Sequence, residues 1–260
     1  MRFHRWIDAL QLKYKRWGFD MSRYTLMISL CLLLFSGSLM AGTPQEYNQA
    51  INLNGDPENG KRLYKVCIVC HGPEGWGTVS GSYPQIAGQL PSVIIKQLAD
   101  FRAGNRDNPM MRPFTTKTIL SDAQAIADIA AYISKLPMTP YNGKGSSFDI
   151  AAGREIYKKE CAECHGDHGE GNVEDHIPLV QGQHFNYLIR QFDWIRIGRR
   201  KNADEKMVKQ IKNFRPIQVH QVMDYISQLQ PPKQKLAQDG WTNPDFPHFQ
   251  RRPFQRHLGK

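Results

Sequence analysis

The chain has 260 residues, which exceeds one typical domain and suits two small ones. Hydrophobic residues make up 40% and aromatic residues 10% of it, a composition that allows packed cores and excludes a chain that is disordered throughout. The formal net charge of +10 favours acidic protein surfaces or anionic lipid as partners.

The N-terminal segment has the layout of a secretory signal. An uncharged run, Tyr24–Gly42, follows basic residues and ends in small ones, and Ala41 is a suitable last residue before cleavage. The alternative is an uncleaved membrane anchor, because a run of 19 residues is just long enough to span a bilayer. We therefore expect residues 1–41 to be a signal peptide or an N-terminal anchor and the remainder to be exported. Outside the cytoplasm, no nucleic-acid partner is expected.

Helical patterns organise the following residues into two units. The first unit comprises residues 42–136, with helices predicted near 57–66, near 90–103 and from the cap Ser121 onward. Residues 137–148 carry the Pro, Gly and Ser residues of a linker. The second unit comprises residues 149–230, with helices predicted near 149–160, 184–197 and 216–229. Strand signals are weak throughout, so the predicted fold class is all-α.

The C-terminal residues 231–260 form a basic and aromatic tail. It has six Lys/Arg against two Asp, and its aromatic residues are Trp241, Phe246, Phe249 and Phe254. One interpretation of the tail is a poorly ordered terminus. The other is an arm that docks on an acidic partner or on the membrane surface.

The two units are copies of one another. A shift of 94 residues superposes the second unit on the first, and the matched positions carry the same residue too often for chance. The first matches are Cys67, Cys70, His71, Gly72 and Pro84 with Cys161, Cys164, His165, Gly166 and Pro178. Further matches are Gly88, Gln89, Gln97 and Arg106 with Gly182, Gln183, Gln191 and Arg200. The duplication predicts two domains of the same fold in tandem.

Each unit contains the sequence C-x-x-C-H, which is the attachment signature of a c-type haem. Two thiols three residues apart on a helix can each add to a haem vinyl group, and the histidine that follows reaches the iron as an axial ligand. We therefore expect two covalent haems, attached at Cys67, Cys70, Cys161 and Cys164, with His71 and His165 on the irons. The haems would also fill the cores of domains that are otherwise small.

A structural zinc site and a redox dithiol are the alternative interpretations of these cysteines. Zinc would need four ligands around one ion, whereas the two pairs lie 94 residues apart in separate repeats. A thioredoxin-like dithiol would need a βαβ context, which the helical pattern does not supply. Two copies of the motif, in a repeat that follows an export signal, favour haem over both alternatives.

The sixth ligand of the first haem is predicted to be a methionine, because no histidine occurs between Gly72 and Ser147. Met111 precedes the last helix of its unit and is best placed to reach back over the haem. Met110 is the alternative ligand, and Met138 is expected to pack within the linker.

In the second repeat the corresponding ligand is predicted to be Met207, which precedes the last helix of that unit. The other candidates are His168, His176, His184, His220 and Met223, of which Met223 is expected in the core. A His/Met pair raises the reduction potential relative to two histidines and fills both axial positions. Filled irons leave no place for a substrate, which indicates electron transfer rather than catalysis.

These residues resemble the dihaem cytochromes of the cytochrome c4 type, which are built from two class I cytochrome c domains, each a small helical fold around a covalent haem. The resemblance covers residues 54–232 and rests on both C-x-x-C-H-G boxes and on the phrases Y-P-Q-I-A-G-Q, K-Q-L-A-D-F-R-A-G-N-R, M-R-P-F and L-S-D-A-Q-A-I-A-D-I-A-A-Y-I. It implies a periplasmic carrier that passes single electrons from a donor such as a cytochrome bc-type complex to a terminal oxidase or another reductase. The second repeat departs from the pattern at H-I-P-L-V-Q-G-Q and N-F-R-P-I-Q-V-H, and the tail is an addition to it.

Two other functions stay open on the sequence. One is the cytochrome subunit of a redox enzyme, such as a flavocytochrome sulfide dehydrogenase, which dihaem chains of this kind also resemble. The other is a dihaem enzyme in which one haem is open to a substrate. A cysteine-ligated iron is not expected, because the fifth cysteine, Cys31, lies in the signal segment.

Overall fold

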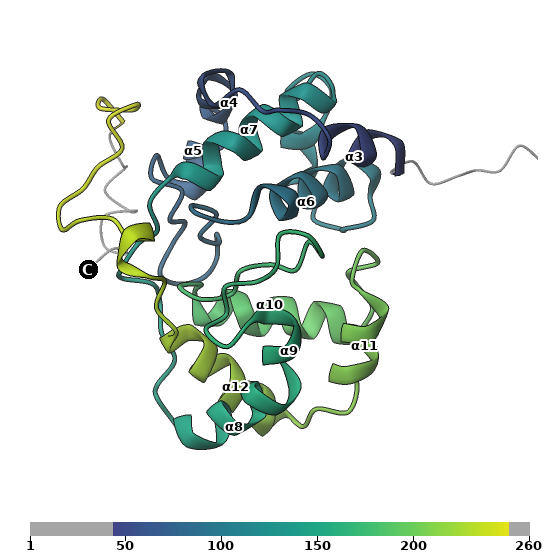
Figure 1. Ribbon diagram of the computed structural model, residues 1–260, viewed down its shortest axis with the longest axis vertical. Coiled ribbons are helices and arrows are strands. Elements are labelled where there is room, and N and C mark those ends of the chain that lie inside the picture. Colours follow the sequence, from purple (N-terminus) through teal and green to yellow (C-terminus); the bar gives the residue numbers. More distant parts are fainter. Residues whose placement is uncertain (1–43, 250–260) are drawn as a thin grey trace, which may run out of the picture. The chain divides into compact units, whose positions relative to one another are not determined.

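The computed structural model describes residues 44–249, and the signal or anchor predicted for residues 1–41 lies outside them. The helices of the first repeat are α3 (Pro44–Ala50), α4 (Pro57–Tyr64), α5 (Ile68–His71), α6 (Pro91–Ala103), η1 (Arg112–Thr115) and α7 (Ala123–Lys135). Those of the second are α8 (Ile150–Glu160), α9 (Ala162–His165), α10 (Phe185–Arg196), α11 (Glu205–Ile211) and α12 (Pro216–Gln228), and η2 (Lys233–Lys235) lies in the tail. Residues 44–249 contain isolated β-bridges but no strand, which confirms the all-α prediction (Figure 1). No helix in this part of the chain is long and apolar enough to cross a membrane.

The long helices agree with the sequence prediction to within two residues at each end, but three details differ. The helices α3 and α11 were not expected from the pattern. Helix α7 is capped by Asp122 rather than by the predicted Ser121, because the Asp122 side chain accepts the backbone N–H of Ala125 at 2.9 Å. Helix α11 has a cap of the same kind, in which Asp204 accepts the N–H groups of Lys206 and Met207.

The same helix pair forms the framework of both repeats. Helix α4 packs on α7, and α8 packs on α12. A glycine at each crossing allows the backbones to approach closely. A Cβ atom at Gly60 would lie 2.1 Å from the Asp128 carbonyl oxygen, and one at Gly153 would lie 2.2 Å from that of Gln221. The duplicated fold that the repeat predicts is therefore present.

Each C-x-x-C-H segment borders the apolar core of its own repeat. Cys67 packs against the first core and Cys161 against the second. A buried tyrosine of the preceding helix fixes the segment that follows: the hydroxyl of Tyr64 donates to the Gly72 carbonyl at 2.9 Å. Tyr157 forms the corresponding bond in the second repeat. The cysteines are thus anchored at the edge of a packed core.

The linker, residues 137–148, is packed between the repeats. Met138 is buried and lies against Gly88 and Gly182, the glycines that the 94-residue shift matches. The side chain of Asn142 is also buried and donates two hydrogen bonds to backbone carbonyls of the second repeat. The packing role expected for Met138 is confirmed.

Matched glutamines join the two repeats, which lie within one compact unit. The side-chain amide of Gln89 donates to the Leu179 carbonyl at 2.9 Å and accepts the Leu179 N–H at 3.0 Å. The amide of Gln183 donates to the Gln85 carbonyl at 2.8 Å and accepts the Gln85 N–H at 3.1 Å. Since Gln85 and Leu179 are also 94 residues apart, this interface, which we call the seam, has an approximate twofold symmetry.

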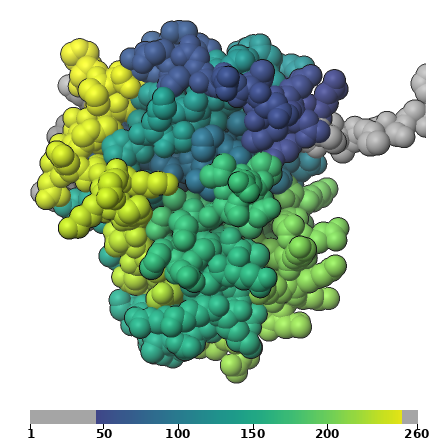
Figure 2. Space-filling view, in the orientation of Figure 1, coloured from purple at the N-terminus to yellow at the C-terminus, as the bar shows by residue number. Residues whose placement is uncertain are grey.

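Residues 231–249 form a strap that folds back over the first repeat. Figure 2 shows this segment in yellow against the blue and teal atoms of that repeat. The buried side chain of Asn243 donates to the carbonyl of Pro73 at 2.6 Å and to the hydroxyl of Tyr132 at 2.9 Å. Phe246 packs against the first core. The interpretation of the tail as a poorly ordered terminus is therefore wrong for residues 231–249, and the remaining residues lie outside the described part.

Candidate functional site

Each predicted haem histidine is held by the same hydrogen bond. His71 Nδ1 donates to the carbonyl of Pro84 at 3.0 Å. His165 Nδ1 donates to the carbonyl of Pro178 at the same distance. Because a carbonyl oxygen only accepts, Nδ1 carries the proton in both rings, and Nε2 keeps its lone pair for a metal ion. Burial lowers the pKa of His71 and of His165, in spite of the bonds to the carbonyls, so both imidazoles are neutral.

The predicted haem cysteines occupy equivalent places on α5 and α9. Cys67 and Cys161 are the N-cap residues, Cys70 is half-buried and Cys164 is exposed. Burial raises the pKa of Cys67 and of Cys161 to about 12, because an apolar environment disfavours the charged thiolate. Within residues 44–249, no three His, Cys, Asp or Glu side chains are grouped as a metal site of their own.

The two segments fit a covalent haem because they repeat one backbone arrangement. In both, the N–H of the histidine donates to the carbonyl of the first cysteine, at 3.0 Å and 2.9 Å. The histidine carbonyl in turn accepts the N–H of Gly77 or Gly171 at 2.8 Å. Each segment thus presents two thiols and a neutral imidazole beside an apolar core. The cysteines would hold the haems and the histidines their irons, and bound haem supplies the iron that exchanges electrons.

The structure favours Met111 over Met110 as the sixth ligand of the first haem. Met111 is half-buried at the start of η1, whereas Met110 has 61% of its surface exposed. The side-chain oxygen of Asn108 accepts both backbone N–H groups and holds this turn. The assignment of Met111 stays a prediction.

Met207 lies in the first turn of α11 and packs against the core of the second repeat. From the sequence, Met207 was predicted to precede the last helix, but the separate short helix α11 that contains it was not predicted. In the first repeat the corresponding segment is the shorter η1. The role of Met207 as sixth ligand also stays a prediction.

His184 has no ring nitrogen left for iron. It is 1% exposed, and its Nδ1 accepts the backbone N–H of Gly143 at 2.9 Å. Its Nε2 donates to the carbonyl of Trp76 in the first repeat at 2.7 Å. The ring therefore joins the linker and both repeats, which removes His184 from the candidate ligands.

Three of the other candidates have packing contacts. The ring of His176 meets Tyr47 of α3 edge-on, with 5.7 Å between ring centroids. The ring of His220 contacts two phenylalanines, Phe148 and Phe185. Met223 lies in the second core, as expected. His168 is exposed.

The stability of the protein is expected to fall below about pH 6.5, because His184 is buried in its neutral form. In the unfolded chain a histidine titrates near pH 6.5, and burial lowers the pKa of His184 in the folded protein. The unfolded state therefore binds the proton first as the pH falls, which lowers the free energy of unfolding by up to about 1.4 kcal/mol per pH unit. Urea unfolding at several values between pH 7 and pH 5 measures this slope. A His184→Gln variant with an unchanged slope would contradict the assignment.

The residues that orient the two histidines are equivalent positions of the repeat, but their role was not predicted from the sequence. Pro84 and Pro178 were recognised as a repeated pair, and only the folded chain shows that their carbonyls fix the two imidazoles. The tyrosines Tyr64 and Tyr157 escaped the comparison, because they lie 93 rather than 94 residues apart. A search that tolerated one insertion would have found them.

Comparison with known proteins gives matches over both repeats. The family model described as cytochrome c matches residues 57–137 and 150–230. Cytochrome c4 of Thiocapsa roseopersicina is 33% identical over 166 residues, which cover 60% of this chain and 82% of that protein. A protein of Stutzerimonas stutzeri strain A1501 named thiosulfate dehydrogenase electron acceptor is 32% identical over 155 residues, which cover 56% of this chain and 70% of that protein.

A solved structure shows the same arrangement. Reduced recombinant cytochrome c4 from Pseudomonas stutzeri superposes with a TM-score of 0.59 at 26% identity, and the match covers 68% of this chain and 100% of that one. Both C-x-x-C-H segments lie inside the ranges of the family model, whereas the strap lies outside them.

Proposed function

This chain belongs to the cytochrome c family, as a protein of the cytochrome c4 type with two covalent haems, and from that premise we propose that it is an exported one-electron carrier between respiratory proteins. The observation that supports the proposal most is the pair of equivalent histidine segments, each with a neutral imidazole whose Nε2 is free for iron. With Met111 and Met207 as the second protein ligands, both irons would have all their coordination positions filled and would leave none for a substrate.

The proposed donor is a cytochrome bc-type complex, and the proposed acceptor is a terminal oxidase or another reductase. The first attachment segment is accessible to a partner protein, because Val69, between its two cysteines, is 61% exposed. The net positive charge supports an acidic partner. The apolar run Tyr24–Gly42 supports export to the periplasm, where this exchange would take place.

A second candidate is the electron acceptor of a thiosulfate-oxidising enzyme. The name of the Stutzerimonas stutzeri relative, thiosulfate dehydrogenase electron acceptor, favours it. In this second function the protein is still an electron carrier, and only the proposed electron donor differs. Reduction of this protein by a thiosulfate dehydrogenase and thiosulfate, at a rate above that with a bc-type complex, would favour the second candidate.

The reduced holoprotein is expected to leave its absorption spectrum unchanged when carbon monoxide is added. Carbon monoxide binds ferrous haem with an open axial position, and the proposed carrier has none. Reductive titration should take up two electrons per chain, and membranes that contain a terminal oxidase should reoxidise the protein. A carbon monoxide shift that corresponds to one haem would instead favour a dihaem enzyme.

Export is tested separately by cell fractionation. The full chain should appear with its haems in the periplasm or on its membrane, and a chain that lacks residues 1–41 should remain in the cytoplasm without covalent haem. Full-length protein that stays in the cytoplasm would contradict the proposed location. The proposed electron transfer would still be tested independently by the carbon monoxide and titration experiments.

A further inference from the structure

The chain has one strap for two repeats, because the residues that follow the first repeat form the linker. The strap begins on that linker: the N–H of Met138 donates to the Lys235 carbonyl, and the Met138 carbonyl accepts the N–H of Ala237, each at 2.8 Å. From there the strap runs over the first repeat (Figure 2). A duplicated fold with a single strap gives its two haem-attachment segments different surroundings.

The strap contacts the loop that follows the first attachment segment. The buried side chain of Asn243 donates to the carbonyl of Pro73 at 2.6 Å. The ring of Trp241 lies beside that of Trp76, with 5.8 Å between ring centroids. The indole N–H of Trp76 donates to the Pro137 carbonyl of the linker at 2.8 Å, which holds its ring in place. The strap and the linker together cover this loop.

The covered loop is part of the support of the first haem histidine. The N–H of Gly77 donates to the His71 carbonyl at 2.8 Å. The carbonyl of Gly75 accepts the N–H of Ile86 at 2.8 Å, close to Pro84, whose own carbonyl binds the His71 ring. The backbone of His71 and the segment that orients its imidazole are therefore both tied to the loop on which the strap lies.

The corresponding loop of the second repeat is open to water. Three residues of the first loop are buried or half-buried, and the residues that the 94-residue shift matches with them are exposed. They are Pro73, Glu74 and Trp76 in the first repeat and Asp167, His168 and Glu170 in the second. The attachment segments differ in the same way, since Cys70 is half-buried and Cys164 exposed, while His71 is buried and His165 half-buried. Water therefore reaches the second segment more readily than the first.

Exclusion of water from an attachment segment changes the energetics of electron uptake. A ferric haem carries one more positive charge than a ferrous haem, and an environment without water disfavours the more highly charged form. Burial is accordingly one of the means by which a protein sets the potential of its haem. The strap has two lysines and two aspartates in residues 231–249, so its formal charge is zero and its effect comes from the cover it provides.

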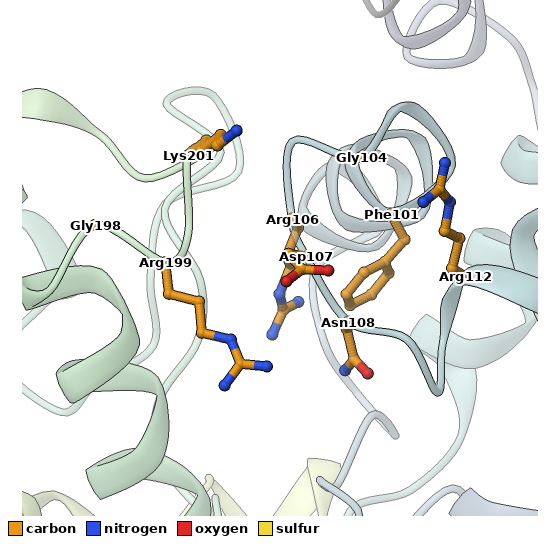
Figure 3. A pocket seen from close by; sticks show the side chains of 9 residues that line it. All are labelled: Phe101, Gly104, Arg106, Asp107, Asn108, Arg112, Gly198, Arg199 and Lys201. Carbon is orange, nitrogen blue, oxygen red and sulfur yellow. The ribbon is translucent and has the colours of Figure 1, made fainter.

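We infer that the strap raises the reduction potential of the first haem, because Trp241 and Asn243 keep water from the attachment segment. Both are positioning residues, which act through Trp76 and Pro73. Figure 3 shows the basic cavity between the loops after α6 and α10; no strap residue lines it, so substitutions in the strap leave its charges in place. The inference rests on the covalent haem and not on the proposed redox partners, so either can fail alone.

The test is a potentiometric titration of the holoprotein, which gives one potential for each haem. Trp241→Ala and Asn243→Ala should each lower the ratio of reduced to oxidised first haem at a fixed potential by about threefold or more, which corresponds to about 30 mV for one electron. The second haem should keep its potential. Met111→Leu and Met207→Leu, which each change one haem, identify the two potentials.

Two further variants serve as controls. Trp241→Phe keeps an aromatic ring against Trp76 and should retain most of the original potential. Thr242→Ala changes the exposed residue between the two positioning residues and should leave both potentials unchanged.

Three results would overturn the inference. The first is an unchanged potential in both alanine variants, even with faster hydrogen exchange of the loop Gly72–Gly77, which would mean that the strap only stabilises the loop. The second is an equal fall of both potentials, which would mean a general loosening of the protein. The third is a fall confined to the potential that Met207→Leu changes. If Asn243→Ala does not fold, Trp241→Ala decides the question, because Trp241 is only half-buried.

Discussion

Replacing Met111 or Met207 by leucine is expected to halve the weak absorption band from methionine sulfur to ferric iron in the oxidised protein. Leucine keeps the volume of the side chain but has no sulfur lone pair, so one iron loses its sixth ligand and the other keeps its own. The same change should lower the reduction potential of one haem only, because the methionine ligand raises it. The optical spectrum and a potentiometric titration of each variant measure the two effects.

Matched methionines serve as controls for this experiment. Met110→Leu and Met223→Leu should keep the full band, because Met110 is largely exposed and Met223 lies in the second core. Half of the band lost in Met110→Leu, with the full band in Met111→Leu, would transfer the ligand role to Met110. A full band in Met207→Leu would require another ligand in the second repeat, and His184 would not be available for it.

The haem chemistry could be predicted from the sequence because it is local. Two thiols and a histidine within five residues, Cys67–His71 and again Cys161–His165, need only one helical turn to present the donor set of a c-type haem. The helices that flank them have regular apolar spacing, and their bounds follow from it. The duplication then transfers each assignment from one repeat to the other.

The interface between the repeats could not be predicted, because its contacts join residues far apart in the chain. Gln89 and Gln183 were visible as a repeated pair, yet either residue could have served its own haem domain. Each in fact binds the backbone of the opposite repeat. Helix α3 was missed because its seven residues lie next to the signal segment and have no strong periodicity. A short helix of this kind is stabilised mainly by tertiary packing, here on α7.

The packing of the strap could not be predicted either, because its composition suggested disorder or an external partner. Its aromatic residues were the signal of a packed segment. Trp241 lies beside Trp76 of the first repeat, with 5.8 Å between ring centroids. Phe246 lies beside Tyr64, with 6.0 Å between ring centroids. Asn243 of the strap binds Pro73, which lies next to the first histidine segment, and only the fold brings these two distant residues together.

Polar contacts fasten the strap to the first repeat at a single place. The hydroxyl of Tyr132, on α7, accepts from Asn243 and donates to Asp245 at 3.0 Å. Asp245 also forms an ion pair with Lys61 of α4 at 3.0 Å. The strap thus joins α4 and α7, the two helices that form the framework of the first repeat. No part of these contacts involves α8 or α12.

Ending the chain after Ala237 is expected to destabilise the first repeat by about 3 kcal/mol and to leave the second unchanged. The loss combines the buried hydrogen bonds of Asn243, about 1–3 kcal/mol, with part of the apolar burial of Trp241 and Phe246. Hydrogen exchange of the holoprotein, measured by mass spectrometry, should show faster exchange in peptides from α4 and α7. Peptides from α8 and α12 are the internal control.

Asn243→Ala is the finer form of the same test, because it removes the central hydrogen bonds and keeps the length of the strap. It should give faster exchange in the same peptides, with a smaller change of about 1–3 kcal/mol. Unchanged exchange of α4 and α7 in both variants would mean that the strap only lies on the surface of the first repeat. Faster exchange in all four helices would mean that the two repeats unfold as one unit, and that the strap stabilises both of them rather than the first alone.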